Sequence, residues 1–421
     1  MKVLSKLISL VLFIEIGTCN LTANEVFSAT DHNESIVITS IEIQGNESTK
    51  KETLIEILPR ELPAHMTNAE ISEYSRRIKN LGIFEYVSVI KEGNTLQVNL
   101  RRKTTLSPII DLTTGKSLED TSAKFGITEH DFLGTATKLG AQVGFDDRNL
   151  NFKAWIAEHD YRNNRWAREL EVYRLSSSFR FDESKDEWKR HRLGAAFEIV
   201  SPFKYDSPLL YEFQLQVYEE TYSDVVSNQI LDRAIYYGGL FEVIYDRYSW
   251  DDLYPHGFKG VIEMRPGQMD NGEFRAEAVA KFIAATPLVK NTSLVTNAEV
   301  AAVNSGNVNH SLLIGSKHGV RGLDDSFYRT SALGYINLEV RHSIEAWEKV
   351  YIQPTLFLDA ARFRPMDADG NNQAWTNALS TGVGLRVIPT GYTNLLFRAD
   401  LARLHTPSDE WFLQFGLTQY F

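Results

Sequence analysis

The feature that most constrains the fold of this chain is a run of alternating segments that extends from residue 104 to the end. Within each segment apolar and polar residues alternate, which is the period of a half-buried β-strand. One segment with its connection takes about twenty residues, the spacing of transmembrane β-barrels. The sixteen segments span residues 104–115, 122–132, 137–148, 150–160, 168–181, 188–200, 211–222, 233–247, 256–267, 273–286, 292–304, 331–343, 349–362, 377–388, 393–403 and 411–421.

The last segment carries its alternating pattern up to the aromatic side chain of Phe421. A sheet that spans a bilayer must pair every backbone donor and acceptor internally, so it closes into a barrel without edges. An even number of strands lets the last strand pair with the first, near Pro108, in antiparallel sense. We therefore expect a mainly β protein with a 16-stranded antiparallel transmembrane β-barrel over residues 104–421. A large soluble β-sandwich, which also alternates, is the competing interpretation.

The N-terminus and the composition predict an exported protein. Positive charges precede an apolar run at residues 8–14, which indicates a secretory signal peptide over residues 1–23, followed by a short linker at residues 24–36. The only cysteine, Cys19, excludes a disulfide framework and a thiolate metal site, and its lipid modification is an alternative to simple cleavage. The net charge of −11 argues against a nucleic-acid partner, which would need a basic footprint.

Residues 37–103 form a small α+β unit of their own. The stretch VITSIEIQGN reads as a strand that ends in a turn, and Ser48 or Thr49 is expected to cap the helix that follows. Asn68 is the expected N-cap of a second helix, and FEYVSVIKEGNTLQVNLRRK reads as a hairpin. The predicted order is therefore strand, helix, helix, strand, strand.

This order, with IEIQGN at its start and LGIFEYVSV at the second helix-strand junction, resembles a single POTRA domain. A generic small α+β domain is the alternative. The resemblance implies an open sheet edge to which an extended client segment adds as a further strand. The candidate client-binding edge is formed by Phe84, Tyr86, Val87 and Val89.

One connection, between the eleventh and twelfth segments, is roughly 25 residues long, where about two to eight is usual. It contains the tetrapeptide VRGL at residues 320–323. An arginine that points into a barrel lumen needs a carboxylate partner, and a planar two-point pair is an arrangement that Arg supports and Lys does not. Glu339 and Asp359 on the next segments are the candidate partners of Arg321. A solvated arginine in a surface turn is the alternative.

Together these features resemble the Omp85 superfamily of outer-membrane assembly and translocation proteins, also called bacterial surface antigen or D15-type proteins. The resemblance rests on the POTRA-like unit, the sixteen segments, VRGL, FLDAA at residues 357–361 and GVGLRVIPTGYTNLLFRADLA at residues 382–402. It implies that Arg321 folds back into the lumen and contacts Asp359 and Glu339, which locks the long loop inside the barrel. The implied loop lock comprises Val320, Arg321, Gly322, Leu323, Glu339 and Asp359.

Some positions depart from the family pattern. Leu323 ends the loop motif where Phe or Tyr is common, and Ala361 stands where Gly is common. The single POTRA unit contrasts with the several units of the essential assembly subunits in this family. Residues 24–36 are also too short for the plug helix and linker of two-partner secretion pores, which disfavours that function.

The resemblance implies a protein of the bacterial outer membrane whose POTRA domain lies in the periplasm. Its POTRA domain would capture unfolded outer-membrane or secreted client proteins, and its barrel would insert or export them through a lateral seam. The implied partners are these clients, outer-membrane lipid and an accessory periplasmic or lipoprotein partner. Residues that mark a weakly paired seam are Pro108, Gly115, Gly416 and Phe421. A passive channel or surface antigen without protein transport is the alternative function.

Enzymatic motifs are absent from the sequence. It contains neither G-x-S-x-G nor H-E-x-x-H, and TTGKS at residues 113–117 lacks the first glycine of a phosphate-binding loop. We therefore expect a protein that is not an enzyme, with no catalytic residues, no metal and no cofactor. A serine and a histidine brought together across neighbouring strands would be an exception that the sequence leaves open.

Overall fold

The structure is a computed structural model. It describes residues 35–46, 48–114, 121–146, 149–158, 167–180, 187–202, 207–223, 233–251, 254–304, 310–317, 319–323, 328–347, 350–367, 369–389 and 396–417. The predicted signal peptide with Cys19 lies outside the described residues, as do the predicted seam residues Gly115 and Phe421.

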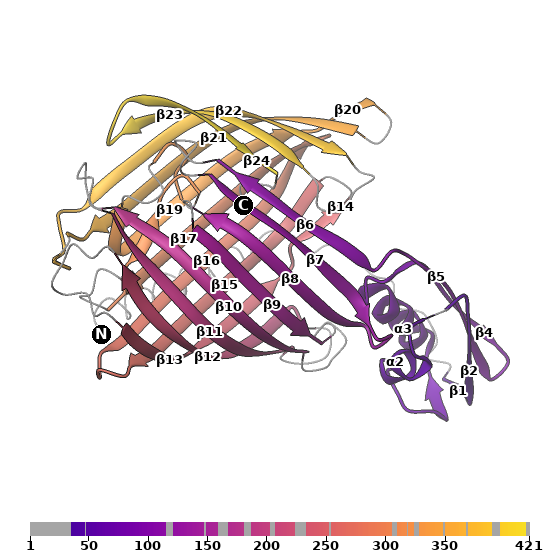
Figure 1. The fold of residues 1–421 in the computed structure, drawn as a ribbon. Helices are drawn as coiled ribbons and strands as arrows, with labels where there is room; N and C mark the ends of the chain where they lie inside the picture. The colour runs from indigo at the N-terminus through magenta and orange to yellow at the C-terminus, as the bar shows by residue number, and fades with distance from the viewer. Residues whose placement is uncertain are drawn as a thin grey trace.

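Sixteen long antiparallel strands close into a single barrel (Figure 1). They are β6 (Leu106–Thr113), β7 (Ser122–Phe132), β8 (Thr137–Asp146), β9 (Asn149–Ala157), β10 (Ala167–Arg180), β11 (Glu187–Pro202), β12 (Leu209–Ser223), β13 (Arg233–Asp246), β15 (Tyr254–Met269), β16 (Phe274–Val289), β17 (Thr292–Val303), β19 (Tyr328–His342), β21 (Val350–Pro365), β22 (Thr376–Pro389), β23 (Phe397–Thr406) and β24 (Glu410–Gly416). The short strands β14 (Ser249–Asp251), β18 (Leu312–Ile314) and β20 (Ile344–Trp347) extend the barrel at its ends and in the long loop. The predicted 16-stranded barrel is thus confirmed, and the β-sandwich interpretation is wrong because the sheet closes on itself.

The outer surface of the barrel is apolar, and its inner surface is polar. On β21, for example, Leu356 and Leu358 are exposed on the outside, whereas Phe357 and Asp359, which alternate with them, are buried inside. Exposed tryptophans lie at both ends of the strands, with Trp347 at one end and Trp411 at the other. An outward apolar band flanked by aromatic residues is the surface that a barrel presents to lipid.

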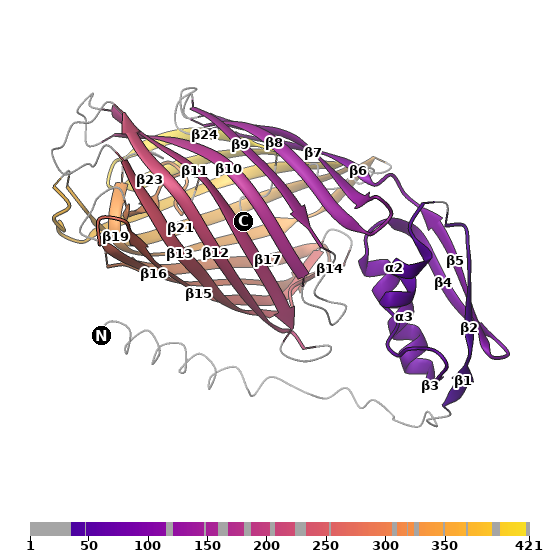
Figure 2. The same cartoon turned by 60° about the horizontal axis from the view of Figure 1, so that its bottom comes forward.

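The N-terminal POTRA-like unit lies beside β6 and β7 at one end of the barrel, here called the POTRA end (Figures 1 and 2). Its elements are β1 (Ile36–Ile38), β2 (Ser40–Gln44), α2 (Lys51–Glu56), β3 (Ala64–Met66), α3 (Asn68–Asn80), β4 (Phe84–Glu92) and β5 (Thr95–Arg102). A three-stranded sheet has the order β2-β5-β4, in which β2 is parallel to β5, and β1 pairs with β3. The expected strand, helix, helix, strand, strand order is present, and the β1–β3 pair is an addition to it.

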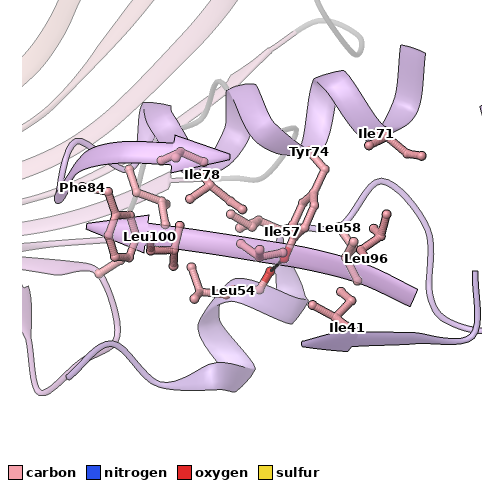
Figure 3. Close-up of a cluster of buried hydrophobic side chains, with 14 of the residues drawn as sticks. Ile41, Leu54, Ile57, Leu58, Ile71, Tyr74, Ile78, Phe84, Leu96 and Leu100 are labelled. Atoms are coloured by element: carbon pink, nitrogen blue, oxygen red, sulfur yellow. Dashed lines mark hydrogen bonds between the residues drawn. The ribbon is translucent and has the colours of Figure 1, made fainter. Parts of the chain in front are cut away.

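The helices of this unit cover one face of its sheet and bury a common apolar core (Figure 3). Ile71, Tyr74 and Ile78 form the buried face of α3 at spacings of three and four residues. The Tyr74 hydroxyl donates a 2.9 Å hydrogen bond to the Leu54 carbonyl and so joins α3 to α2. None of the helices within the described part of the chain is long and apolar enough to cross a membrane.

The barrel closes where its last strand, β24, meets its first strand, β6. Within the described residues, β24 pairs with β6 at one position, Gly416 with Thr113. A 3.0 Å backbone hydrogen bond from the Leu417 N–H to the Leu112 carbonyl continues this contact. We call the β6–β24 contact the seam.

Candidate functional site

The long connection between β17 and β19 folds back into the barrel. Its strand β18 pairs with β19, and the chain then turns inward so that Val320 and Leu323 are buried in an apolar cluster on the inner wall. Phe363 and Leu404 belong to the same cluster. The departure at Leu323 from an aromatic residue is therefore accommodated, because the leucine is 1% exposed among other apolar side chains.

Arg321 forms the centre of the site. Its Nε and Nη2 atoms donate to the two carboxylate oxygens of Asp359, each over 2.7 Å, and Nη1 donates to Glu339 over 2.6 Å. The Arg321 backbone N–H also donates to Asp359 over 3.1 Å. All three side chains are fully buried, so a solvated arginine in a surface turn is the wrong interpretation. The structure thus brings together the three charged residues that the sequence singled out.

Aromatic and amide groups complete the surroundings of Arg321. The guanidinium lies 3.5 Å from the centroid of the Phe357 ring, a cation–π arrangement. The Asn337 side chain donates to Asp359 over 2.9 Å and to the Gly319 carbonyl over 2.6 Å. Asn337 therefore fixes both the carboxylate and the loop backbone that presents Arg321.

The charged network extends to residues that the sequence analysis did not single out. Arg386 on β22 donates to Asp400 over 2.7 Å and to Glu339 over 3.2 Å. Arg341 donates to Glu339 over 2.6 Å, and Arg398 lies 3.5 Å from Asp400. Each of these side chains is almost completely buried. With Arg321, four guanidinium groups surround three carboxylates, so each buried carboxylate has at least one guanidinium partner inside the barrel.

Three glycines leave the space that this network needs. A Cβ atom on Gly384 would lie 2.0 Å from Nη1 of Arg386, and one on Gly382 would lie 2.3 Å from the Phe357 ring. Gly322 adopts a φ of +95°, and a Cβ atom there would lie 2.7 Å from the Phe412 ring. The GVG of β22 and the glycine of VRGL are therefore required by the packing around Arg321.

The loop lock also touches the strand that closes the barrel. Phe412, against which Gly322 packs, lies on β24, and a Cβ atom on Gly416 would lie 2.8 Å from the Arg398 guanidinium. Of the predicted seam residues, Gly416 pairs with Thr113 of β6, and Pro108 on β6 pairs with Ile127 of β7 on the other side. The lock and the seam are thus neighbours in the structure, a relationship that no sequence motif indicates.

The predicted client-binding edge is an outer strand of the POTRA-like sheet. Among the described residues β4 pairs only with β5, so one of its edges is open. Phe84 and Val87 are buried toward the helices, whereas Tyr86 is exposed on the opposite face. An open pocket of about 360 Å³ runs beside this edge, lined by Ile71, Ser72, Ser75, Arg76 and Lys79 of α3 and by Val89 of β4.

The structure does bring one serine and histidine together across neighbouring strands. Ser176 Oγ on β10 lies 2.9 Å from Nδ1 of His191 on β11. Only 5% of Ser176 is exposed, and its backbone N–H is held by the Asn151 side chain. An ester carbonyl needs access to the serine Oγ, so this burial argues for a cross-strand hydrogen bond rather than a nucleophile.

Comparisons with known proteins identify the fold. Neither a protein-family model nor a curated protein sequence matches the chain. The structure is similar to BamA from Haemophilus ducreyi lacking POTRA domains 1–3, with 16% identity over 90% of this chain and 84% of that one and a TM-score of 0.66. It is also similar to CdiB from Acinetobacter baumannii, with 13% identity over 91% of this chain and 73% of that one and a TM-score of 0.63. CdiB from Escherichia coli has 10% identity over 94% of this chain and 93% of that one, with a TM-score of 0.57. The chain therefore has the Omp85 fold, a barrel preceded by one POTRA-like domain.

Proposed function

We propose that the protein is an outer-membrane assembly or translocation factor of the Omp85 type. Its POTRA-like domain, placed in the periplasm, captures unfolded outer-membrane or secreted proteins, and its barrel inserts or exports them through the seam. The observation that carries this proposal is the closed 16-stranded barrel preceded by one POTRA-like domain, the fold that this chain shares with BamA and CdiB. The lipid-facing outer surface and the shared fold with BamA and CdiB support the location in the outer membrane.

Opening of the seam requires the backbone hydrogen bonds between β6 and β24 to be broken. A backbone N–H or C=O group that loses its hydrogen bond costs about 1–3 kcal/mol when no water molecule can take the partner's place. In the described part of the seam, Gly416 pairs with Thr113, and backbone hydrogen bonds run from the Leu417 N–H to Leu112 and from the Thr114 N–H to Phe415. A client strand that adds to the freed edge of β6 satisfies the same backbone groups, so insertion of a strand offsets the cost of opening.

Client capture is proposed to occur at the open edge of β4. An extended segment that adds there gains main-chain hydrogen bonds, and its alternate side chains point toward the adjoining pocket. The pocket has an apolar floor at Ile71 and Val89 and an exposed lysine, Lys79, at its rim. This surface favours unfolded segments with alternating apolar side chains, which are the segments of a barrel strand.

The loop lock argues against a passive channel. The loop that carries Arg321 is anchored to the inner wall through Asp359 and Glu339, and it occupies the lumen beside β19 and β21. A segment fixed there obstructs diffusion through the barrel, whereas it leaves the seam on the outer surface accessible to a client.

We further propose that the protein works without a catalytic site, cofactor or nucleic acid, and that folding of the client drives insertion. An accessory periplasmic or lipoprotein partner remains part of this proposal.

A quantitative comparison of outer-membrane and secreted proteomes before and after depletion of the protein tests the proposed function. Loss of many barrel proteins would identify a general insertase, and loss of one exported protein would identify a dedicated translocase. Unchanged proteomes in cells that lack every paralogue would refute the proposal and favour a channel or surface antigen.

A further inference from the structure

The POTRA-like domain is joined to the barrel at a second place besides the covalent link. The turn between β7 and β8 reaches the N-terminal end of α2. There the Lys50 N–H donates a 2.7 Å hydrogen bond to the Gly134 carbonyl, and the Thr53 hydroxyl donates to the same carbonyl over 3.2 Å. Ala136 of this turn is completely buried in the core of the POTRA-like domain. The two units therefore share both hydrogen bonds and core.

Asp131, the second-last residue of β7, makes hydrogen bonds to both units at this contact. Its Oδ2 atom accepts a 2.8 Å hydrogen bond from the Thr49 hydroxyl and lies 3.3 Å from the Arg102 guanidinium. Its Oδ1 atom accepts from the Ala136 N–H over 2.9 Å, which holds the β7–β8 turn in shape. The Asp131 side chain is fully buried. One carboxylate thus binds the residue just before the N-cap of α2, the end of β5 and the barrel turn.

The conformation of the turn also depends on this contact. Gly134 adopts a φ of +72°, and a Cβ atom there would lie 2.3 Å from the Ser48 carbonyl oxygen. Ala136, which is not a glycine, also has a positive φ, of 54°. Backbone in this region costs roughly 1–3 kcal/mol for non-glycine residues and persists where the surroundings fix it. The apolar core of the POTRA-like domain, in which Ala136 is buried, supplies such surroundings.

The covalent link leaves little freedom between the units. β5 ends at Arg102, and β6, the first strand of the seam, begins at Leu106. Within this link the Lys103 N–H donates to the Ile83 carbonyl over 3.1 Å, and the Thr105 carbonyl accepts from the His130 N–H over 3.0 Å. A link this short with its backbone groups bonded on both sides cannot act as a flexible tether.

We propose that the β7–β8 turn is a socket that fixes the POTRA-like domain at one angle to the barrel, with Asp131 as its positioning residue. Because β5 pairs with β4 and continues into β6, the socket holds the open β4 edge at a fixed place relative to the seam. A strand captured at β4 is then presented to β6 in one orientation. The socket itself is a property of the fold and holds whether or not the protein transports clients.

Distance measurements between two spin labels test the socket in the full chain. Exposed positions for the labels are Glu92 in the β4–β5 hairpin and Lys290 at the POTRA end of β16, each changed to Cys with Cys19 replaced. The unaltered socket should give one narrow distance distribution. In Asp131→Ala the distance distribution should become broad. Asp409 is an exposed residue at the opposite end of the barrel, so Asp409→Ala should leave the narrow distribution unchanged.

A second variant keeps the test valid if Asp131→Ala misfolds. Thr49→Val removes one hydroxyl of the socket and lies outside the barrel, so the barrel should remain resistant to unfolding in detergent on gels. We expect Thr49→Val to broaden the distance distribution as well. A broad distribution in the unaltered protein, or a narrow one retained in both Thr49→Val and Asp131→Ala, would overturn the proposal. If Asp131→Ala fails to fold, Thr49→Val alone decides it.

Discussion

Arg321 and Asp359 form a two-point ion pair inside the barrel, although 38 residues separate them in the chain. Both side chains are fully excluded from solvent. Such a pair is weak evidence of net stabilisation, because removing two charges from water is costly. Removing one partner is strongly destabilising, because it leaves a buried charge without a counter-ion. We therefore interpret the pair as a specific contact that holds the loop in one position.

Replacing Arg321 should detach the loop. Arg321→Ala leaves Asp359 buried without the guanidinium that pairs with it, which costs about 3–5 kcal/mol in comparable buried pairs, whereas Glu339 keeps Arg341 and Arg386. We expect less folded barrel on gels and faster protease cleavage of the loop. Arg321→Lys should recover only part of this loss, because an ammonium cannot make the planar two-point contact.

The control for this variant is an arginine of similar chemistry at the surface. Arg403 pairs with Asp409, and both side chains are about half exposed. Exposed pairs contribute about 0–1 kcal/mol, so Arg403→Ala should resemble the unaltered protein. Equal behaviour of Arg321→Ala and Arg403→Ala would remove the idea of a loop lock.

Gly322→Ala should disturb the same lock by steric means. The added Cβ atom meets the Phe412 ring at 2.7 Å and places alanine at a φ of +95°, a conformation that costs roughly 1–3 kcal/mol. Gly260→Ala is the matched control, because no atom lies within 4 Å of its added Cβ. Heat resistance of the folded band should fall for Gly322→Ala only, and equal losses in the two variants would contradict the packing argument.

Client segments should be captured beside β4 and not beside β2, the other outer strand of the POTRA-like sheet. A photoreactive amino acid at Ser72, which lines the pocket next to β4, should cross-link to unfolded barrel proteins during their assembly. The same group at Glu42, on β2, should not. Cross-links of equal yield at both positions, or at Glu42 alone, would place the binding edge elsewhere.

The capping box of α3 should give the POTRA-like domain an acid-sensitive stability. Partial burial raises the pKa of Glu70, but hydrogen bonds from the Thr67 backbone N–H and from Arg60 outweigh it and hold this pKa below its usual value of about 4.3. Because the folded pKa is lowered, the stabilisation is present above the unfolded pKa and is lost as pH falls through the folded pKa.

Amide hydrogen exchange of α3 in Glu70→Gln and the unaltered protein measures this effect. Glu70→Gln keeps the Thr67 cap and removes the negative charge, which is worth about 0.3–1 kcal/mol at a helix N-terminus, so protection should differ roughly two- to fivefold at neutral pH. Comparison of the two proteins at each pH cancels the intrinsic pH dependence of exchange. The difference should shrink below the folded pKa, and a difference that is equal at neutral and strongly acidic pH would show that the Glu70 charge contributes nothing.

Most of the fold follows from the sequence because the barrel is governed by a local pattern. Each strand shows its own alternation of apolar and polar residues, and the structure places β7 at the predicted residues 122–132. The observed helix starts differ from the predicted ones where hydrogen bonds between a side chain and the backbone decide the start. The helix α3 is capped by Thr67 and not by Asn68, because Thr67 and Glu70 exchange hydrogen bonds in a capping box. The predicted side-chain cap of α2 is also absent, since Lys50 occupies that position.

The candidate site was only partly predictable for a different reason. Arg321, Glu339 and Asp359 belong to recognisable motifs, so their meeting was expected. Asp400 and Arg386 join them through the closure of the barrel, which brings β22 and β23 against the loop. A charged residue at an inward position between apolar outward neighbours is the signal that would have found both. The socket at Asp131 has no comparable signal, because it depends on how two units dock.

A reversible cross-link of the seam tests the central claim most directly. Leu112 and Leu417 are joined by a backbone hydrogen bond across the seam, so Leu112→Cys with Leu417→Cys should form a disulfide there once Cys19 is replaced. Val383→Cys with Leu401→Cys, at paired positions of β22 and β23, gives the matched control. In cells that depend on the variant, oxidation of the seam pair should stop assembly or export of clients and reduction should restore it, while the control pair works throughout. Client assembly at the normal rate with the seam oxidised would contradict a mechanism in which the barrel opens between β6 and β24.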